Sequence, residues 1–382
     1  MGRIVASCAT GGATVALMKP LLAAIAFGGL LVGFAWQQTS GPAKAGHYVP
    51  NYVLSAQASP SSRTSAGIVA AANAFLATLT DAQRMRGTFA FESSQRTGWS
   101  NLPSPMFRRN GLRLGDLMPA QRSAALALMA AALSREGYQK ITDIMNGDEM
   151  LKNAGGGRTG GRPGGGGRGG GPQFGSDEYY VALLGAPSPT APWLIQFGGH
   201  HLAINVTVVG SISVMTPSLP AAQPAKYVLN GQTIRPLGDE NDKAFALMDT
   251  LDAAQRKQAI LPYQVRDLVL GPGEDGKTIQ PEGIVGTALN ANQQSLLLDV
   301  AHEWVGILND EAASAKMNEI KGNLARTYFA WSGTTTNGGL AYYRIQGPTV
   351  VIEYAPQQGD LDHIHTIYRD PTNDYGAKLT SR

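Results

Sequence analysis

The sequence repeats itself at a fixed spacing, and this constrains the fold more than any other feature. A leucine followed four positions later by glutamine, and then by Arg or Gln, occurs at Leu79, Leu117, Leu251 and Leu289. The first and third copies lie 172 residues apart, as do the second and fourth. A pattern that recurs at a long fixed period indicates that one structural unit is used more than once. We therefore predict an internally duplicated chain.

A second match follows in the region where strands are expected. "YYVALLG" (179–185) matches "TYFAWSG" (327–333), and "WLIQFGGHHLAINV" (193–206) matches "AYYRIQGPTVVIEY" (341–354). Both matches are 148 residues apart, so the offset falls by 24 between the helical part and the strand part. The first half must therefore contain an insertion of about that length between these two parts.

The segment 154–175, "AGGGRTGGRPGGGGRGGGPQFG", accounts for the difference. It is low in complexity and occurs only in the first half, which predicts a solvated loop insertion. An RNA-binding segment rich in Arg and Gly is the alternative. That alternative is disfavoured because the segment has three arginines and no aromatic residue before Phe174.

Each half follows the same plan of helices and then strands. Apolar residues recur every three or four positions over 66–91, 120–150, 240–269 and 291–326, which predicts helices there. "T-D-A-Q" and "N-A-N-Q" are typical of helix N-termini. The fold class is therefore predicted to be α+β, with a first repeat over 66–237 and a second over 238–382.

Short β-prone segments follow the helices in each half. The longest breaks at Gly198-Gly199 in the first half and at Gly347-Pro348 in the second, which predicts a β-hairpin in each. "HIHTIYRD" (363–370) is the last strand, and "ISVMT" (212–216) is its expected counterpart. Each half is thus a helical layer followed by an antiparallel meander, and we expect a pseudo-two-fold axis between them.

The first 45 residues resemble a secretory leader. They contain three basic residues and no acidic one, an apolar stretch over 20–36, and the cleavage pattern Ala43-Lys44-Ala45. We expect a cleaved signal peptide or, alternatively, an uncleaved N-terminal anchor over 20–36, followed by a linker over 46–65. Either form predicts an exported protein, periplasmic or extracellular, with membrane contact only through an uncleaved leader.

Charge and cysteine content exclude several classes of function. Removing Arg3, Lys19 and Lys44 from the 31 basic residues leaves 28, equal to the 28 acidic residues. A near-neutral chain lacks the concentrated positive charge that nucleic-acid binding needs, so no nucleic-acid partner is expected. Cys8, the single cysteine, falls in the leader. The mature chain therefore has no disulfide and no thiol chemistry.

Two adjacent histidines mark the turn of the first hairpin. His200 and His201 align with Pro348 and Thr349 of the second half. Since the second hairpin is formed without histidine, the turn does not require these side chains. This favours a functional role, with capping of local carbonyl groups as the alternative.

The stronger polar cluster is "DHIHTIYRDP" (362–371). In a strand, His363, His365 and Arg369 share one face, and two imidazoles so placed are a common pair of metal ligands. If the neighbouring strand pairs in the expected register, Glu353 lies opposite His363, which completes a site of two histidines and one carboxylate. A solvated edge strand is the alternative.

His201 and His200 are the alternative ligands in place of Glu353. A divalent metal is the expected cofactor. Zinc is favoured because the ligands are nitrogen and oxygen atoms without cysteine, and copper and iron also suit them. Arg344 and Arg369 are the candidates for steadying negative charge during a reaction, unless they form structural salt bridges with acids such as Asp360 or Asp370.

The same motifs resemble a family of exported proteins known only as a domain of unknown function. The resemblance covers most of 66–376. It rests on five segments together: "RTGWSNLP" (96–103), "LSREGYQKITDIM" (133–145), "GHHL" (199–202), "YYRIQGPTVVIEY" (342–354) and "HIHTIYRDPTNDYG" (363–376). Asp362 stands where the family has Asn, Tyr368 where it commonly has Trp, and its C-terminal His-Tyr ending is absent. The resemblance implies export and no settled reaction.

The leading hypothesis is an exported metal-dependent enzyme, most simply a hydrolase in which a metal-activated water attacks a small-molecule substrate. Its ligands are His363, His365 and either Glu353 or His201. The alternative is a non-catalytic exported protein that binds a small ligand between the two repeats. A third hypothesis is a structural protein of the cell envelope with no site. The absence of a G-x-S-x-G motif argues against an α/β-hydrolase.

Overall fold

The computed structural model describes residues 64–155 and 171–380. The expected leader (1–45), nearly all of the linker (46–65) and the centre of the glycine-rich insertion (154–175) lie outside these residues. The described residues belong to one compact unit. None of their helices combines the length and the apolar character needed to span a bilayer.

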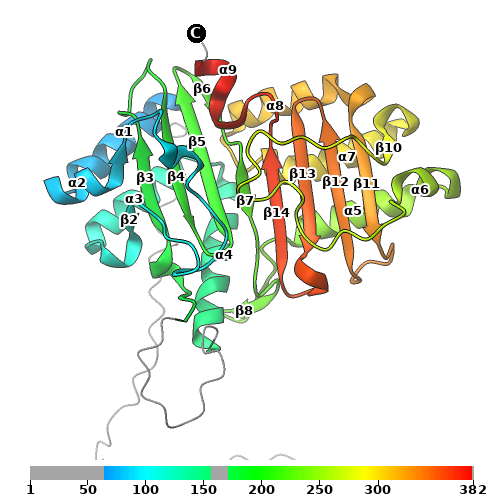
Figure 1. Ribbon diagram of the computed structural model, residues 1–382, viewed down its shortest axis with the longest axis horizontal. Coiled ribbons are helices and arrows are strands. Elements are labelled where there is room, and N and C mark those ends of the chain that lie inside the picture. Colours follow the sequence, from blue (N-terminus) through cyan, green and yellow to red (C-terminus); the bar gives the residue numbers. More distant parts are fainter. Residues whose placement is uncertain (1–63, 156–170, 381–382) are drawn as a thin grey trace, which may run out of the picture. The chain divides into compact units, whose positions relative to one another are not determined.

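A single 12-stranded sheet runs through both halves of the described chain (Figure 1). Its main strand order is β1-β3-β4-β5-β7-β14-β13-β12-β11-β10, while β2 pairs with β3 and β6 with β5. The strands are β1 (Thr88–Phe89), β2 (Leu112–Arg113), β3 (Tyr180–Leu184), β4 (Trp193–Gly199), β5 (Leu202–Val209), β6 (Ile212–Val214), β7 (Ser218–Pro220), β10 (Ile284–Val285), β11 (Tyr328–Gly333), β12 (Ala341–Gly347), β13 (Val350–Pro356) and β14 (Ile364–Arg369). A separate hairpin consists of β8 (Tyr227–Leu229) and β9 (Gln232–Ile234). Together with the helices, this confirms the α+β class.

The two halves join where β7 pairs with β14 in antiparallel fashion, through Tyr368 and Ser218. An isolated bridge between Ala222 and Ile364 continues this junction. The sheet therefore passes without interruption from the strands before the expected repeat boundary at 237–238 to the strands after it.

Each of the four expected helical regions contains two elements. The helices are α1 (Ser65–Ala77), α2 (Asp81–Gly87), α3 (Pro119–Ala132), α4 (Arg135–Asn153), α5 (Gly238–Thr250), α6 (Ala253–Ala259), α7 (Ala291–Val305), α8 (Asp310–Gly322) and the short C-terminal α9 (Ala377–Thr380). The expected helix over 66–91 breaks because Thr80 caps a new N-terminus and forms a capping box with Gln83. Ser134, Asp252 and Asn309 cap the second helix of the other three regions with their side chains, and Asp252 also forms a capping box with Gln255.

The repeated glutamines meet in reciprocal pairs. In the first half, the Gln83 and Gln121 side chains donate to one another at 3.1 and 2.8 Å. In the second half, Gln255 and Gln293 do the same at 2.9 Å in both directions. Gln121 also donates to the Thr78 carbonyl, and Gln293 to the Thr250 carbonyl. The glutamine of the repeated Leu-x-x-x-Gln motif therefore joins helices within each half.

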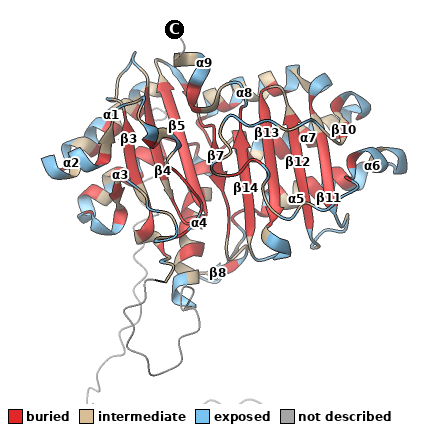
Figure 2. Ribbon diagram, viewed as in Figure 1, coloured by how far each residue is buried: buried red, intermediate tan, exposed pale blue. Residues whose placement is uncertain are grey.

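The helices lie on one face of the sheet and form the main core with it (Figures 1 and 2). On this face Trp331, Tyr343 and Tyr354 form a row across three neighbouring strands, with stacked rings 6.0 and 5.1 Å apart. The Tyr343 hydroxyl donates to the Glu240 carbonyl of α5 and so fixes the helix layer to the sheet.

Long loops cover the opposite face, with 90–111 over the first half and 260–283 over the second (Figure 1). Gln95 and Gln196 bond to one another there, and Gln196 also donates to Asn205. Because helices cover one face of the sheet and these loops cover the other, most strand residues are buried on whichever face they lie (Figure 2). Side chains in the middle of this face are therefore buried beneath a loop.

The two predicted hairpins are confirmed. Gly199 pairs with Leu202 across a two-residue loop, and Gly347 pairs with Val350 across another. The expected counterpart of β14 is corrected: β6, within 212–216, pairs only with β5. The next strand, β7, joins β5 to β14 instead. Both β6 and β7 pair with β5, but β7 also pairs with β14 of the second half.

Replacing Gln293 with alanine tests the role of the glutamine pairs. Gln293 is 3% exposed, and its loss removes the hydrogen bond to the Thr250 carbonyl and both hydrogen bonds with the Gln255 amide. We expect the free energy of unfolding, measured by urea denaturation, to fall by about 2 kcal/mol. The matched control Gln139→Ala, on the exposed face of α4, changes it by less than about 0.5 kcal/mol. Equal effects of the two variants would contradict this interpretation.

Candidate metal centre

Three imidazole rings converge at the junction of the two halves. Nε2 of His363 lies 2.8 Å from Nε2 of His201 and 3.0 Å from Nε2 of His365. The three residues offer ligand atoms within 4.8 Å of one another, a spacing at which they could hold one metal ion. His201 and His365 are buried, while His363 is half-buried. The exposed side of the cluster is therefore the side of His363.

The first hairpin positions His201 through an uncommon backbone conformation. Its φ of 60° lies in the left-handed region, which non-glycine residues rarely adopt. Two backbone hydrogen bonds hold it there: the His201 N–H donates to the Asn101 carbonyl at 3.1 Å, and the Ala221 N–H donates to the His201 carbonyl at 2.8 Å. A strained residue held on both sides is typical of a functional position.

The second half supplies the other two rings. His365 lies on β14 and pairs with Ala355, whereas His363 lies in the loop just before that strand. The bridge between Ala222 and Ile364 places both histidines beside the segment that also bonds to His201. The three rings are therefore fixed relative to one another by the β13–β14 pairing, the Ala222–Ile364 bridge and the Ala221–His201 hydrogen bond.

Asp267 and Asn101 orient the His365 ring. Asp267 Oδ1 lies 2.9 Å from Nδ1 of His365, and the Asn101 amide nitrogen lies 3.2 Å from its Nε2. Burial, the largest single influence, would raise the pKa of Asp267. The hydrogen bond from His365, the charges of His365 and His363 and the hydrogen bond from the Leu268 N–H together outweigh it and hold the pKa below its ordinary value. An ionised Asp267 accepts the Nδ1 proton and leaves the Nε2 lone pair free. This is the usual arrangement behind a metal-binding histidine.

The protons of three neutral imidazoles cannot satisfy all of these contacts. With its Nε2 unprotonated, His365 can only accept from His363. The single Nε2 proton of His363 then serves one neighbour, and a His201 ring protonated at Nδ1 has no partner for that atom. A shared cation satisfies all three lone pairs at once. Ligand nitrogens around a tetrahedral zinc lie about 3.4 Å apart, for bonds of about 2.1 Å, so the rings need to separate by only a few tenths of an ångström.

The pKa values of His201 and His363 favour the neutral form that metal binding needs. Burial, together with repulsion from the neighbouring histidines, holds the pKa of His201 well below its ordinary value. The same two causes lower the pKa of His363 to about 4. Neutral imidazole nitrogens are metal ligands, so these two rings do not have to lose protons near neutral pH before a metal binds.

Glu353 is not part of the cluster, and the expected register is wrong. Glu353 pairs with Ile367 rather than with His363. Its carboxylate accepts hydrogen bonds at 2.8 Å from the Val269 and Leu270 N–H groups and from the Tyr342 hydroxyl. The residue lies on the predicted face but further along the sheet, and it fixes the covering loop. The third residue of the cluster is His201, the alternative candidate that the sequence also offered.

His200 points to a different partner from its neighbour. Its Nδ1 lies 2.6 Å from Oδ1 of Asp148 on α4, and both side chains are buried. Its ring packs on the His201 ring with the centroids 3.6 Å apart. His200 therefore belongs to the wall of the site, and the structure does not bring it into the three-histidine cluster.

The two candidate arginines are occupied by structural contacts. Arg369 is 2% exposed, and its guanidinium donates to the Leu270 and Gly271 carbonyls and to Asp275 and Asp374. It pairs with neither of the expected acids, since Asp370 binds Lys316 instead. These contacts favour a structural role for Arg369 over the predicted role in catalysis.

Arg344 is buried on β12, where it pairs with Glu282 at 2.9 Å. The Glu282 carboxylate also accepts a hydrogen bond from the Tyr263 hydroxyl. Arg344 lies directly opposite Glu353 in the sheet, away from the row that contains His365. The arginine therefore belongs to the contacts that hold the covering loop rather than to the metal centre.

Sequence reasoning missed Asn101, Asp148 and Asp267. Asn101 lies within the "RTGWSNLP" segment that carries the family resemblance, and this was a usable signal. Asp148 lies near the end of a helix and Asp267 in a loop, and neither belongs to a recognisable motif. Their roles follow only from the tertiary fold.

Comparison with known proteins gives one match. A family model described as "Protein of unknown function (DUF3500)" matches residues 61–377. The resemblance to a family without an assigned function is thereby confirmed. No curated protein and no solved structure matches the chain.

Replacing Arg369 with alanine separates a structural role from a catalytic one. The change removes the buried guanidinium from two carboxylates and two carbonyl groups. We expect the free energy of unfolding to fall by about 3 kcal/mol, with bound metal per folded chain unchanged. The control Arg326→Ala, at an exposed site, has little effect. A variant of normal stability that loses only catalytic activity would refute the structural assignment.

Proposed function

We propose that this chain, which belongs to the DUF3500 family of proteins of unknown function, is an exported metal-dependent enzyme, most simply a hydrolase. His201, His363 and His365 are its metal ligands. Export is proposed from the leader-like first 45 residues, which lie outside the described part of the chain.

The observation that carries this proposal is the convergence of three Nε2 atoms, one of them on a ring oriented by a carboxylate. Scattered surface histidines do not meet at 2.8 and 3.0 Å, and they are not backed by an ionised aspartate. Three nitrogen ligands with one side open are typical of catalytic zinc sites, whereas structural zinc sites are closed by four protein ligands. Copper and iron also accept imidazole ligands, and the test below includes them.

A metal held here would polarise a water molecule and lower its pKa, so that hydroxide forms near neutral pH. The side chains around the metal would form the walls of the site and hold the substrate. His201 and His365 form the buried floor of the site, and the half-buried His363 borders the side from which a substrate approaches. Asn101 donates to the same nitrogen that a metal would bind, so metal binding would release its amide to hold a substrate oxygen.

We also propose that the two halves arose by internal duplication and are related by a pseudo-two-fold axis. The reciprocal glutamine pairs and the two-residue hairpin loops support it, since they recur at the expected offsets. The metal ligands do not recur. Thr349 occupies the position of His201 in the second hairpin, and β7 contains no histidine. The site is therefore an addition to a fold that can form without it.

A second candidate function is small-ligand binding without catalysis. It is favoured by a cavity of about 640 Å³ between helices of the two halves, lined by residues such as Lys140, Lys243 and Glu303. Lys140 already pairs with Glu240 and Glu303, and Lys243 pairs with Glu303. These charges neutralise one another, and we favour the metal centre because its three imidazoles converge on one point.

Metal analysis of the purified protein tests the metal site. After incubation with zinc, copper or iron and removal of the excess, we expect one metal ion per chain by plasma mass spectrometry. His201→Ala, His363→Ala and His365→Ala each lose it, because two remaining imidazoles bind too weakly to survive removal of the excess. The matched control His302→Ala, an exposed histidine on α7, retains it. Metal-free wild-type protein, or retention by all three variants, would falsify the metal site.

Hydrolysis is tested separately. The loaded protein is assayed with aryl esters, phosphate esters and peptide amides. We expect turnover of one class that a chelator abolishes and added metal restores. Bound metal without turnover of any class would contradict the hydrolase proposal while leaving the metal site intact.

The Asp267→Ala variant tests how the site is oriented. Removing a carboxylate behind a metal-binding histidine costs about 10- to 100-fold in metal affinity, because the ring then loses its orientation and its favoured protonation state. We expect a loss of that size in competition titrations with a chelating dye, and a smaller loss for Asp267→Asn, which keeps an acceptor oxygen. Asp299→Ala, at an exposed position on α7, is the control. Unchanged affinity in Asp267→Ala would show that the His365–Asp267 contact does not support the metal.

A further inference from the structure

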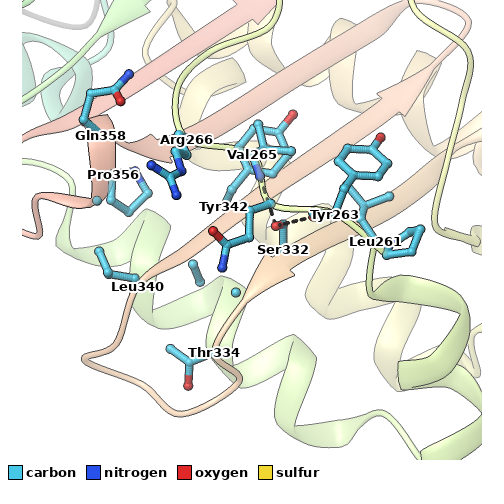
Figure 3. A pocket seen from close by; sticks show the side chains of 15 residues that line it. Leu261, Tyr263, Val265, Arg266, Ser332, Thr334, Leu340, Tyr342, Pro356 and Gln358 are labelled. Carbon is cyan, nitrogen blue, oxygen red and sulfur yellow. Dashed lines mark hydrogen bonds between the residues drawn. The ribbon is translucent and has the colours of Figure 1, made fainter.

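We propose that an open pocket beside the metal centre binds a small organic anion, with Arg266 as the anion-binding group. The pocket has a volume of about 960 Å³ and lies between the loop 261–266 and the ends of β11, β12 and β13 (Figure 3). This volume is at the upper end of the range for small-molecule sites, about 300–1,000 Å³. The proposal that it binds an anion stands on the pocket alone, whereas its use as a substrate site rests on the proposed function.

The charge of the pocket selects the class of ligand. Among the described residues, no aspartate or glutamate lines the pocket, and Arg266 is its one ionised side chain. The Arg266 guanidinium is exposed and has no hydrogen bond or ion pair with any residue that the structure describes. Its five donors suit the two oxygens of a carboxylate or a phosphate. Other arginines nearby differ, since Arg344 and Arg369 are both paired with acids.

The other side chains that line the pocket indicate that the anion has an apolar portion. Leu261, Leu340 and Pro356 contribute aliphatic surface, and Tyr263 and Tyr342 contribute rings (Figure 3). Leu340 is 42% exposed, so its side chain is accessible to a ligand in the pocket. An apolar wall with one convergent charged group is the usual composition of a small-molecule site.

The walls are held in place before any ligand binds. The Ser332 hydroxyl donates to the Tyr263 carbonyl at 2.9 Å and accepts from the Val265 N–H at 3.2 Å, as Figure 3 shows. Gln358 has a φ of 52°, and its N–H donates to the Arg266 carbonyl at 2.8 Å. The strained Gln358 thus fixes the backbone that carries the anion-binding side chain, and strain of this kind is typical of ligand sites.

The same two segments form the pocket wall and the metal centre. Arg266 is followed directly by Asp267, which orients His365. Pro356, which lines the pocket, pairs with Ile364, and the Gln357 N–H donates to the His363 carbonyl at 2.8 Å. An anion bound to Arg266 therefore lies next to the segments that present two of the three imidazoles. In the proposed enzyme it would be the part of the substrate that does not react.

Calorimetric titration with three matched probes tests the proposal. The probes are 3-phenylpropionate, phenyl phosphate and the uncharged 3-phenylpropan-1-ol. We expect at least one anion to bind at least tenfold more tightly than the alcohol. Whichever anion binds more tightly identifies carboxylate or phosphate as the preferred group. Arg266→Ala should weaken that anion at least tenfold, and Arg266→Lys less, because lysine keeps the charge but loses the paired donors.

Three further variants keep the test independent of folding and of the metal. Leu340→Trp fills the pocket from an exposed position and should also abolish binding, while Arg86→Ala, at an exposed site on α2, should not. His363→Ala should bind the anion normally, so failure of the metal site would leave this result unaffected. Binding of neither anion, equal binding of the alcohol, or full binding by Arg266→Ala with an unchanged melting temperature would overturn the proposal.

Discussion

The short ladder between β7 and β14 is the contact on which the rest of the structure depends. It consists of the pair Ser218 and Tyr368 and the nearby bridge between Ala222 and Ile364. These few hydrogen bonds turn two meanders into one sheet and bring the first hairpin turn beside the start of the last strand. Without them the residues on either side, His201 and His365, would lie in separate units. The geometry of the site is thus a consequence of how the halves join.

The loops over the second face impose the other main constraint. A sheet covered on both sides leaves little room for an unpaired charge, because a buried ion without partners is very costly. Glu353 is 0% exposed, and it meets this requirement by accepting two backbone N–H groups and one hydroxyl. Arg369 meets it with two carbonyl groups and two carboxylates. The sequence suggested a metal-binding role for Glu353 and a catalytic role for Arg369. In the structure both side chains instead hold the loop 260–283 on the sheet.

The sequence predicted those features that depend on local periodicity and missed those that depend on loop paths. The offset between Gln121 and Gln293 marked equivalent helices, and the Gly-Pro pair at 347–348 marked a hairpin, because helix and turn signals are local. The register of Glu353 was wrong because the connection to His363 contains an unusual turn at Gln358, and register follows turn geometry. Asp267 was missed because it reaches its partner His365 across 98 residues through a loop without a motif.

The position of the cluster has a thermodynamic consequence. Its three rings come from both halves, so the complete set of donors exists only when the junction is formed. A metal that binds this set and not the unfolded chain stabilises the folded junction, and the stabilisation grows with the ratio of metal concentration to dissociation constant. If all three rings lay within one hairpin, a bound metal would stabilise only that hairpin. Because the three rings lie across the junction, binding of a metal to them would be linked to the association of the two halves. His201, whose φ lies in the left-handed region, is held at this junction by backbone hydrogen bonds on both of its sides.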